Sequence, residues 1–229
     1  ARANQKLAVA CVTTGPGGLN CLNGVFGAWT DSAPVLFISG QVKYTTTLSS
    51  CPDIPLRQLG DQEANIIRVV TPLTKFAKMV TDPYDIDAAI EEAVFKATTG
   101  RPGPVWIDIP LNVQAAPIDE TKLKKFIRPT EKTADMADKL RQAADLLKKA
   151  KRPVLIAGNG IHCARAQKDL RAFLDKTQIP VLGTFNGFDL IPSDDPLFAG
   201  RIGTVGQRAG NFALQNADVV LCVGTRNNI

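Results

Sequence analysis

Short apolar runs alternate with helical patterns along most of the sequence, and no other feature limits the fold as strongly. This alternation is typical of strand-helix-strand units, in which a parallel sheet is buried on both faces. We therefore predict an α/β fold with parallel sheets. The runs expected to form strands are residues 7–12, 34–39, 105–109, 154–157, 181–183 and 219–223.

The segments between these runs carry helical periodicity. Residues 85–99 place their apolar side chains on one stripe, and Gly100 follows as a stop signal. Residues 137–150 and 164–177 show the same pattern. The stripe of the first helix consists of Ile86, Ala89, Ile90, Ala93, Val94 and Ala97.

The 229 residues exceed the usual size of one domain. Near the middle the pattern breaks into proline, lysine and threonine, including Pro117 and Pro129. We predict domains at residues 1–112 and 135–229, joined by a linker at 113–134. Because the chain lacks an initial Met and no helix follows its last strand, we also expect it to be a fragment with sequence missing on both sides.

Composition excludes several classes of protein. Hydrophobic residues make up 45% and charged residues 21%, which are ordinary values for a globular protein. The net charge of +5 comes from lysines such as Lys122, Lys124 and Lys125. We interpret these as solvated helix faces rather than a nucleic-acid site, since no aromatic residues alternate with them. No apolar run approaches the ~18 residues of a membrane span, and no signal segment is present.

The cysteines and the single histidine also limit the chemistry. The 5 cysteines are odd in number, widely spaced and lack a C-x-x-C pair. This pattern argues against disulfides or zinc and favours a reducing cytoplasm, with the cysteines as small buried apolar residues. With only His162 available, a site of clustered histidines is excluded; we interpret His162 as a helix-start or surface residue.

Four polar or glycine-rich segments follow or precede the predicted strands. Residues 13–20 and 40–42 follow strands, where ligands bind in parallel sheets, although a tight turn would explain the glycines equally well. Residues 58–63 end a long Thr-, Ser- and Pro-rich loop, and Gln62 or Glu63 either lines a pocket or begins a helix at 64–69. Residues 100–104 lead into the strand at 105–109.

Taken in order, these segments resemble a known family. The series T-G-P-G-x-x-N, D-S-x-P-V-x-x-I-S-G-Q-V, D-Q-E and T-G-R-P-G-P-V-x-I-D-I-P is similar to the pyrimidine-binding domain of thiamine-diphosphate enzymes of the acetolactate synthase group. The later K-R-P-V-L-I-A-G-N-G-I and residues 180–184 and 223–226 resemble the family's Rossmann-like central domain. The resemblance covers nearly all of the chain.

The resemblance implies a role for particular residues. Pro16, Gly17 and Asn20 match positions around the aminopyrimidine of thiamine diphosphate, and Gln62 matches a glutamine that projects into the active centre. The family's catalytic glutamate would lie upstream of Ala1. The Mg²⁺ ligands belong to a Gly-Asp-Gly motif that this chain lacks, so no metal ligand is expected within it.

The family's central domain commonly holds FAD, while some relatives bind ADP or nothing there. Some positions depart from the acetolactate synthase pattern: Asn159 replaces a usual glycine, Asp61 a phenylalanine and Leu111 a lysine near the substrate channel. No Phe-Asp-Asp follows Arg226. The residues that match the FAD or ADP site are Arg101, Gly158, Asn159, Gly160, Thr184, Gly203, Gly206, Gly224 and Arg226.

The resemblance implies that the intact protein decarboxylates a 2-oxo acid such as pyruvate and transfers the acyl carbanion to an acceptor. It also implies a homodimer or homotetramer with an active site shared between subunits, and an inactive fragment. Two alternatives stay open. One is another thiamine-diphosphate lyase or hydrolase of the same group; the other is a flavin- or dinucleotide-binding module without carboligase activity.

Overall fold

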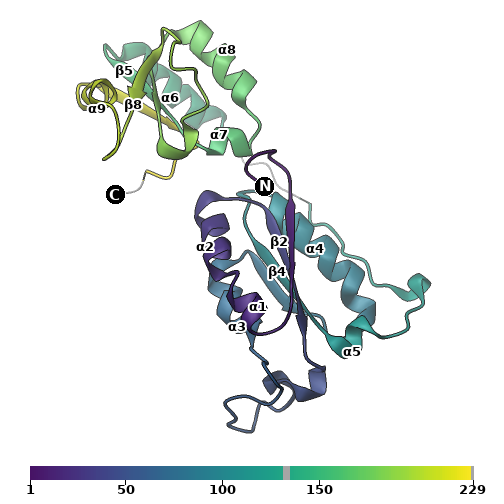
Figure 1. Cartoon of the computed structure of the whole chain (residues 1–229). Helices are drawn as coiled ribbons and strands as arrows, with labels where there is room; N and C mark the ends of the chain where they lie inside the picture. Colours follow the sequence, from purple (N-terminus) through teal and green to yellow (C-terminus); the bar gives the residue numbers. More distant parts are fainter. Residues whose placement is uncertain (131–134, 228–229) are drawn as a thin grey trace. The chain divides into compact units, whose positions relative to one another are not determined.

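The computed structural model describes residues 1–130 and 135–227, and these form two compact units (Figure 1). The units comprise residues 1–130 and 131–229. Each contains a sheet of four strands that pair in parallel. The predicted α/β fold with two parallel sheets is therefore confirmed, while the bounds given above for the domains and their linker stay a prediction.

The first unit is a sheet with the strand order β1-β2-β4-β3. The strands are β1 (Ala8–Val12), β2 (Val35–Gln41), β3 (Phe76–Met79) and β4 (Val105–Pro110). The α-helices are α1 (Pro16–Leu19), α2 (Leu22–Asp31), α3 (Ile66–Val70), α4 (Ile86–Thr98) and α5 (Leu111–Gln114). Single 3₁₀ turns lie at η1 (Tyr44–Thr46), η2 (Leu48–Ser50), η3 (Thr71–Leu73), η4 (Pro83–Asp85) and η5 (Glu120–Lys122).

Helices cover both faces of this sheet because successive side chains of a strand point to opposite faces. Leu36 and Ile107 pack with the alanine stripe of α4 on one face. On the other face Phe37 stacks on Trp106, with ring centroids 5.1 Å apart, beneath α2 and α3. Figure 1 shows α4 on one side of β2 and β4, and α2 and α3 on the other.

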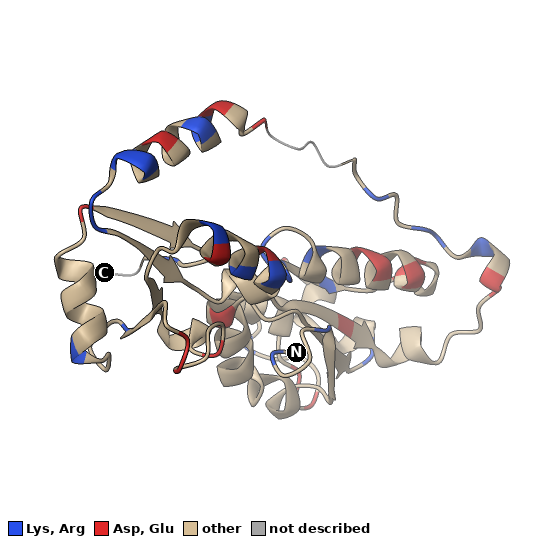
Figure 2. Cartoon of the chain, turned by 90° about the horizontal axis from the view of Figure 1, so that it is seen from above, with Lys and Arg blue, Asp and Glu red and all other residues tan. Residues whose placement is uncertain are grey.

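The second unit repeats this plan with the strand order β7-β6-β5-β8. Its strands are β5 (Pro153–Ala157), β6 (Val181–Gly183), β7 (Phe198–Arg201) and β8 (Val219–Val223). Its helices are α6 (Ala137–Lys149), α7 (Gly160–Cys163), α8 (Gln167–Thr177) and α9 (Arg208–Gln215), with a 3₁₀ turn η6 (Phe185–Gly187). Acidic and basic residues alternate along the exposed α6 (Figure 2).

Two opposed clusters form the core of this unit. Leu155 and Val181 face one side of the sheet and pack with Leu174 of α8. Ile156 and Leu182 face the other side, where they pack with Leu214 of α9 and its neighbours. Three-residue β6 is fully buried between the layers, as a continuous apolar run in a parallel sheet predicts.

Several sequence predictions are wrong in detail. Strands β3 and β7 were not expected, and the helix predicted at 164–177 begins only at Gln167, because Arg165 adopts a left-handed φ of 54° between α7 and α8. The sheets are not buried on both faces throughout. The edge strands β1 and β8 alternate half-buried and exposed side chains, and Val9 is 60% exposed.

The prediction of buried cysteines is also wrong. Cys11 and Cys222 are exposed because they lie on the outward face of the edge strands β1 and β8. The remaining cysteines, Cys21, Cys51 and Cys163, are half-buried.

The lysine-rich segment after α5 lies against α4 rather than forming part of a helix face. Lys124 forms ion pairs with Asp82 and Asp85, at 2.9 and 2.6 Å. The ring of Phe126 lies 5.5 Å from that of Phe95 on α4. Exposed ion pairs contribute little to stability. The contact between the two aromatic rings therefore does more to hold this segment against the first unit.

Candidate functional site

The glycine-rich turn 13–20 lies at the carboxyl edge of the first sheet. Strands of a parallel sheet all end at the same edge, so the turn after β1 lies near the ends of β2 and β4. Helix α1 starts with Pro16, whose fixed φ suits the first helical position. Asn20 follows the helix and is exposed. The side chains predicted to meet a ligand therefore face outward from the sheet edge.

Gly15 brings this turn into contact with the loop that carries Gln62. Its φ is +52°, and a Cβ added at this position would collide with the carbonyl oxygen of Gln62. Gly18 also packs closely, although less tightly than Gly15, because its Cβ would lie 3.3 Å from the side chain of Ile66 on α3. The turn at residues 13–20 and the loop at residues 58–63 are therefore in contact. The two glycines permit this close approach because they have no side chain.

Gln62 has an unusual backbone for its residue type. It is exposed and adopts a left-handed φ of 55°, which costs on the order of 1 kcal/mol in a residue other than glycine. Helix formation does not explain this conformation, because α3 begins at Ile66 and is capped by Asn65, whose side chain accepts from the backbone N–H of Arg68 at 3.1 Å. The alternative that Gln62 or Glu63 begins a helix at 64–69 is therefore wrong.

Glu63 organises the long loop instead of lining a pocket. It is buried, and its carboxylate accepts from the backbone N–H of Leu48 at 2.8 Å and of Leu59 at 3.3 Å. These bonds satisfy two backbone donors in a segment with little regular structure. Gln62 is thus presented next to a residue that anchors its loop.

A buried polar network that sequence reasoning missed lies behind the turn. The Asp108 carboxylate of β4 accepts from Ser39 Oγ at 2.5 Å and from Gln41 Nε2 at 3.0 Å. Burial raises the pKa of the Asp108 carboxyl to about 6, although the hydrogen bonds from Ser39 and Gln41 oppose this rise. An ionisable residue inside an otherwise apolar strand was the signal that would have found it.

In the second unit, the glycines matched to a nucleotide site are used for packing within the protein. A Cβ on Gly160 would lie 2.6 Å from the Cα of Gly224, and one on Gly158 would collide with the Gly224 carbonyl. The turn after β5 therefore packs directly on the end of β8. Thr184 lies close by at the end of β6, where its hydroxyl donates to the carbonyl of Ala157 at 3.1 Å.

Three other members of this set, Gly203, Arg226 and Arg101, differ in their surroundings. Gly203 has a φ of +106°, and its backbone N–H and C=O are both bonded to the side chain of Asn211, at 3.0 and 3.1 Å. Arg226 is exposed near the end of the chain. Arg101 belongs to the first unit, where its Nε donates to Ser32 at 2.7 Å, so neither unit contains the whole set.

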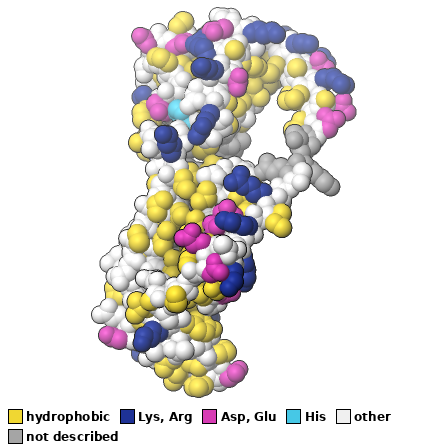
Figure 3. All heavy atoms as spheres, turned by 90° about the vertical axis from the view of Figure 1, so that its right-hand side faces the viewer, with side chains coloured by type: hydrophobic (Ala, Val, Ile, Leu, Met, Phe, Trp, Pro, Cys, Tyr) yellow, Lys and Arg dark blue, Asp and Glu magenta, His cyan; other side chains and the backbone are white. Residues whose placement is uncertain are grey.

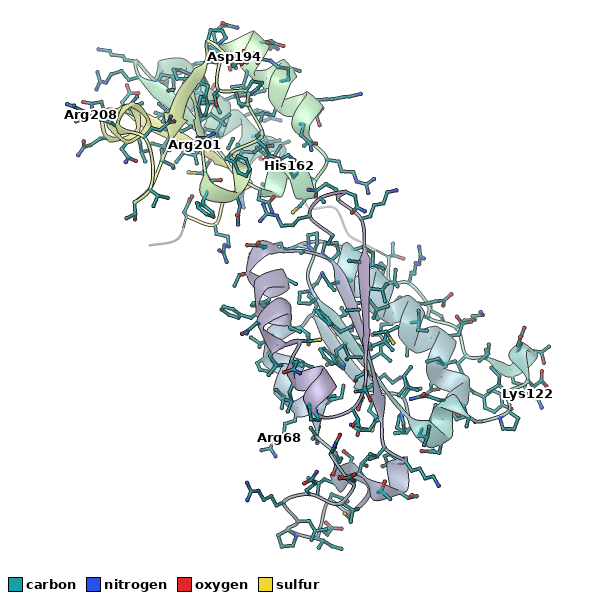
Figure 4. The ribbon with its side chains drawn as sticks, in the orientation of Figure 1. Arg68, Lys122, His162, Asp194, Arg201 and Arg208 are labelled. Atoms are coloured by element: carbon teal, nitrogen blue, oxygen red, sulfur yellow. The ribbon has the colours of Figure 1, made fainter. Side chains whose placement is uncertain are left out.

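The last two members of the set, Asn159 and Gly206, lie at the same end of the sheet. Asn159 precedes α7, and its side-chain amide lies 3.6 Å from the sulfur of Cys163. Gly206 packs against the carbonyl of Arg201, since its Cβ would lie 2.7 Å from that oxygen. Arg201, which sequence reasoning missed and which Figure 4 labels, lies at the end of β7 and has a buried Nε that no acceptor satisfies in the described part of the chain. A buried guanidinium donor without a partner is the feature of this unit that best suits an anionic ligand.

His162 lies on α7, at the helix start predicted for it, and is held from both sides. Its Nε2 is 2.9 Å from Asp189 Oδ1, and its Nδ1 is 2.8 Å from Gln167 Nε2. The Gln167 amide donates to Nδ1, so the proton on Nε2 is directed to Asp189. The single histidine appears as the cyan patch in Figure 3, with most of its side chain enclosed.

The described residues also limit what the chain can do by itself. Within residues 1–130 and 135–227, no group of three or more His, Cys, Asp or Glu side chains is arranged to hold a metal ion. None of the helices in these ranges is both long and apolar enough to cross a membrane.

The structure defines an α/β protein with two parallel sheets, and the candidate site residues of the first unit lie at the carboxyl edge of its sheet. Residues 1–64 match the family model of the thiamine pyrophosphate enzyme N-terminal TPP binding domain. Residues 140–229 match that of the thiamine pyrophosphate enzyme central domain. Together the two models cover more than half of the chain, which belongs to the thiamine pyrophosphate enzymes.

The chain is similar to acetolactate synthase large subunits. It is 34% identical to that of Lactococcus lactis subsp. lactis over 230 residues, which is 99% of this chain and 38% of that protein. It is 36% identical to the chloroplastic acetolactate synthase 1 of Oryza sativa subsp. japonica, covering 99% of this chain and 34% of the relative. Isozyme 2 of Escherichia coli (strain K12) is 34% identical, with 99% and 39% covered. The chain thus spans well under half of their length.

Proposed function

We propose that the intact protein decarboxylates a 2-oxo acid such as pyruvate and transfers the resulting acyl group to an acceptor, as an acetolactate synthase does. The observation that carries this proposal is the contact between Gly15 and Gln62. It joins the two segments that match the coenzyme site of the family at one exposed edge of the sheet. The names of the similar proteins support the reaction class.

The residues present fit half of a thiamine-diphosphate site. Pro16, Gly17 and Asn20 would contact the aminopyrimidine, and the exposed side chain of Gln62 would reach into the active centre from the neighbouring loop. The strained backbone of Gln62 supports this role, since strain of this kind accumulates at functional positions. When bound, the coenzyme supplies the carbanion chemistry, while these residues bind and orient it.

The remainder of the site is proposed to come from outside this chain. The described residues offer no acidic cluster for Mg²⁺, so we assign the metal and the diphosphate to other parts of the intact protein. We further propose a homodimer or homotetramer with the active site shared between subunits. The odd number and wide spacing of the cysteines support a reducing compartment, which we take to be the cytoplasm.

The test is a purified intact protein assayed with thiamine diphosphate and Mg²⁺. We expect release of CO₂ from pyruvate or a related 2-oxo acid, and loss of that activity when Gln62 is replaced by Ala. An intact protein that neither binds thiamine diphosphate nor is stabilised against heat by it would overturn the proposal.

The second unit is proposed to bind FAD or ADP. The buried, unpartnered Nε of Arg201 supports an anionic ligand there, whereas Gly158, Gly160 and Gly224 do not, since packing within the protein already explains them. Flavin released on denaturing the intact protein would support FAD. Absence of any bound nucleotide, together with no thermal shift on adding FAD or ADP, would contradict it.

Leu111 bears on the choice of substrate. Leu111 stands where acetolactate synthase has a lysine, and it is 51% exposed directly after the carboxyl end of β4. An exposed apolar side chain in place of a cation favours a 2-oxo acid with a larger apolar substituent than that of pyruvate. A panel of 2-oxo acids, acyl-CoA thioesters and cyclic diketones, with product identification, separates carboligation from the lyase and hydrolase reactions of the group. Redox turnover without carboligation would support the flavin-binding alternative.

A further inference from the structure

The side chain of Gln41 connects three separate segments at the carboxyl edge of the first sheet. Its Nε2 donates to the carbonyl of Ala64 and to Asp108 Oδ2, both at 3.0 Å. Its Oε1 accepts from Thr14 Oγ1 at 2.6 Å and from the backbone N–H of Val42 at 3.0 Å. Both donors and both acceptor directions of the amide are therefore used, and the side chain is only 5% exposed.

These partners lie on either side of the contact between Gly15 and Gln62. Thr14 directly precedes Gly15 in the turn, and Ala64 follows Gln62 by two residues. The side-chain amide of Gln41 therefore links the turn to the loop, close to the point where Gly15 meets Gln62. Hydrogen bonds in a buried site hold such segments more firmly than exposed ones do.

Asp108 determines which way the amide of Gln41 points. An ionised carboxylate only accepts hydrogen bonds, so the NH₂ group must face it. The other carboxylate oxygen is held by Ser39, which in turn accepts from Trp106 Nε1 at 2.8 Å. Reversing the amide would place its oxygen against both Asp108 and the carbonyl of Ala64. Ser39 and Asp108 are also register partners in β2 and β4, so the sheet itself aligns them.

We propose that Gln41 is a positioning residue for the coenzyme site, which holds the turn 13–20 and the segment 62–64 at a fixed separation while Asp108 orients its amide. This inference rests on the function proposed above. Gln41 itself does not reach the exposed site, because it is buried behind the turn. Its effect passes through Thr14 on one side and Ala64 on the other.

The experiment uses the intact protein and measures the Kd for thiamine diphosphate in the presence of Mg²⁺, together with kcat and the thermal unfolding temperature without coenzyme. Gln41→Met keeps the length of the side chain and removes its hydrogen bonds. Thr74→Val is the matched control, since Thr74 is also buried in this unit and its hydroxyl donates to the carbonyl of Val70 at 3.0 Å. We expect both variants to unfold at lower temperature, but only Gln41→Met to raise the Kd, by about tenfold.

A second pair of variants covers the case in which Gln41→Met does not fold. Thr14→Val removes only the hydroxyl that donates to Gln41, whereas Thr14→Ser keeps it. We expect Thr14→Val to raise the Kd by about three- to tenfold and Thr14→Ser to bind close to the wild type. A purely structural role would change the unfolding temperature in these variants and leave the Kd unaltered.

The outcomes separate this inference from the proposed function. If wild-type protein binds the coenzyme and both Gln41→Met and Thr14→Val bind it with the wild-type Kd, the positioning role is wrong and the proposed function stands. If the wild-type protein does not bind thiamine diphosphate at all, the proposed function fails and the positioning role fails with it.

Discussion

The carbonyl oxygen of Gln62 occupies the space that a Cβ atom would need at position 15, so these two residues fix the approach of the turn to the loop. Both have left-handed backbones, with φ of 52° at Gly15 and 55° at Gln62. Only Gly15 can adopt this conformation without cost. The pair therefore combines a glycine that the contact requires with a strained residue, Gln62, whose side chain is exposed.

Substitution of Gly15 by Ala will damage both folding and coenzyme binding. The added Cβ meets a backbone oxygen and the positive φ disfavours any L side chain, so we expect a loss of at least about 2 kcal/mol in the free energy of unfolding. Gly24→Ala is the control, because Gly24 lies in α2 with open space around it, and alanine there should add about 0.5–1 kcal/mol. Urea unfolding of the 229-residue chain measures both; equal effects of the two substitutions would contradict the contact.

Replacing Gln62 by Gly will raise stability and lower activity. Glycine relieves the left-handed strain, which should add about 0.5–1 kcal/mol to the free energy of unfolding, while the side chain proposed to reach the active centre is lost. Gln178→Gly is the matched control, since Gln178 has the same φ of 55° at the end of α8. We expect the control to leave kcat unchanged in the intact protein. Equal kcat values for both variants would show that the side chain of Gln62 does not contribute to activity.

The stability of the first unit will depend on pH through Asp108. Its pKa is about 6 in the folded chain against 3.8 for the unfolded reference, so the folded state binds more protons between these values. The contribution of Asp108 is therefore complete below pH ~4 and is lost as the pH rises through ~6, by an amount on the order of 3 kcal/mol.

Comparison with Asp108→Asn isolates this effect. The unfolding free energy of the wild type should fall relative to that of the variant between pH 4 and pH 7. Other carboxyls, such as those of Asp195 and Asp218, have lowered pKa values and act in the opposite direction, but they are common to both proteins. Parallel curves for the two proteins would show that Asp108 does not titrate in this range.

We expect Arg201 to strengthen the binding of FAD or ADP by the second unit. Its Nε lacks an acceptor, so Arg201→Met should remove a charge-assisted bond to an anionic ligand and lower the retained FAD or ADP by about tenfold or more. Arg208→Met serves as the control, because Arg208 lies over the Phe212 ring on α9 with its guanidinium 5.3 Å from the centroid. The nucleotide content of the intact protein after gel filtration is the measurement, and equal retention in the two variants would contradict the assignment.

The sequence alone predicts the central strands and the long helices well, because their apolar periodicity is strong. The strand expected at residues 181–183 is observed as Val181–Gly183, and the helix at 85–99 is observed as Ile86–Thr98. Edge strands β3 and β7 could not be predicted in this way. Both are four residues long and end close to charged side chains, Lys78 and Arg201, so neither forms a clear apolar run.

The site is predictable only in part for a related reason. Asn20 and Gln62 belong to local motifs, which the sequence displays directly. The network of Ser39, Gln41 and Asp108 depends on the register between β2 and β4, and residues so far apart in the chain are brought together only by tertiary structure. The explanation of Gly158 and Gly224 by mutual packing is likewise a property of the folded unit.

Strands β1 and β8 each lie at one edge of their sheet, and each carries an exposed thiol, Cys11 on one and Cys222 on the other. An unpaired strand edge can recruit a second molecule, and exposed thiols on such an edge can then oxidise to a covalent cross-link. Purified in aerated buffer, this polypeptide will therefore accumulate disulfide-linked multimers that disappear on adding dithiothreitol.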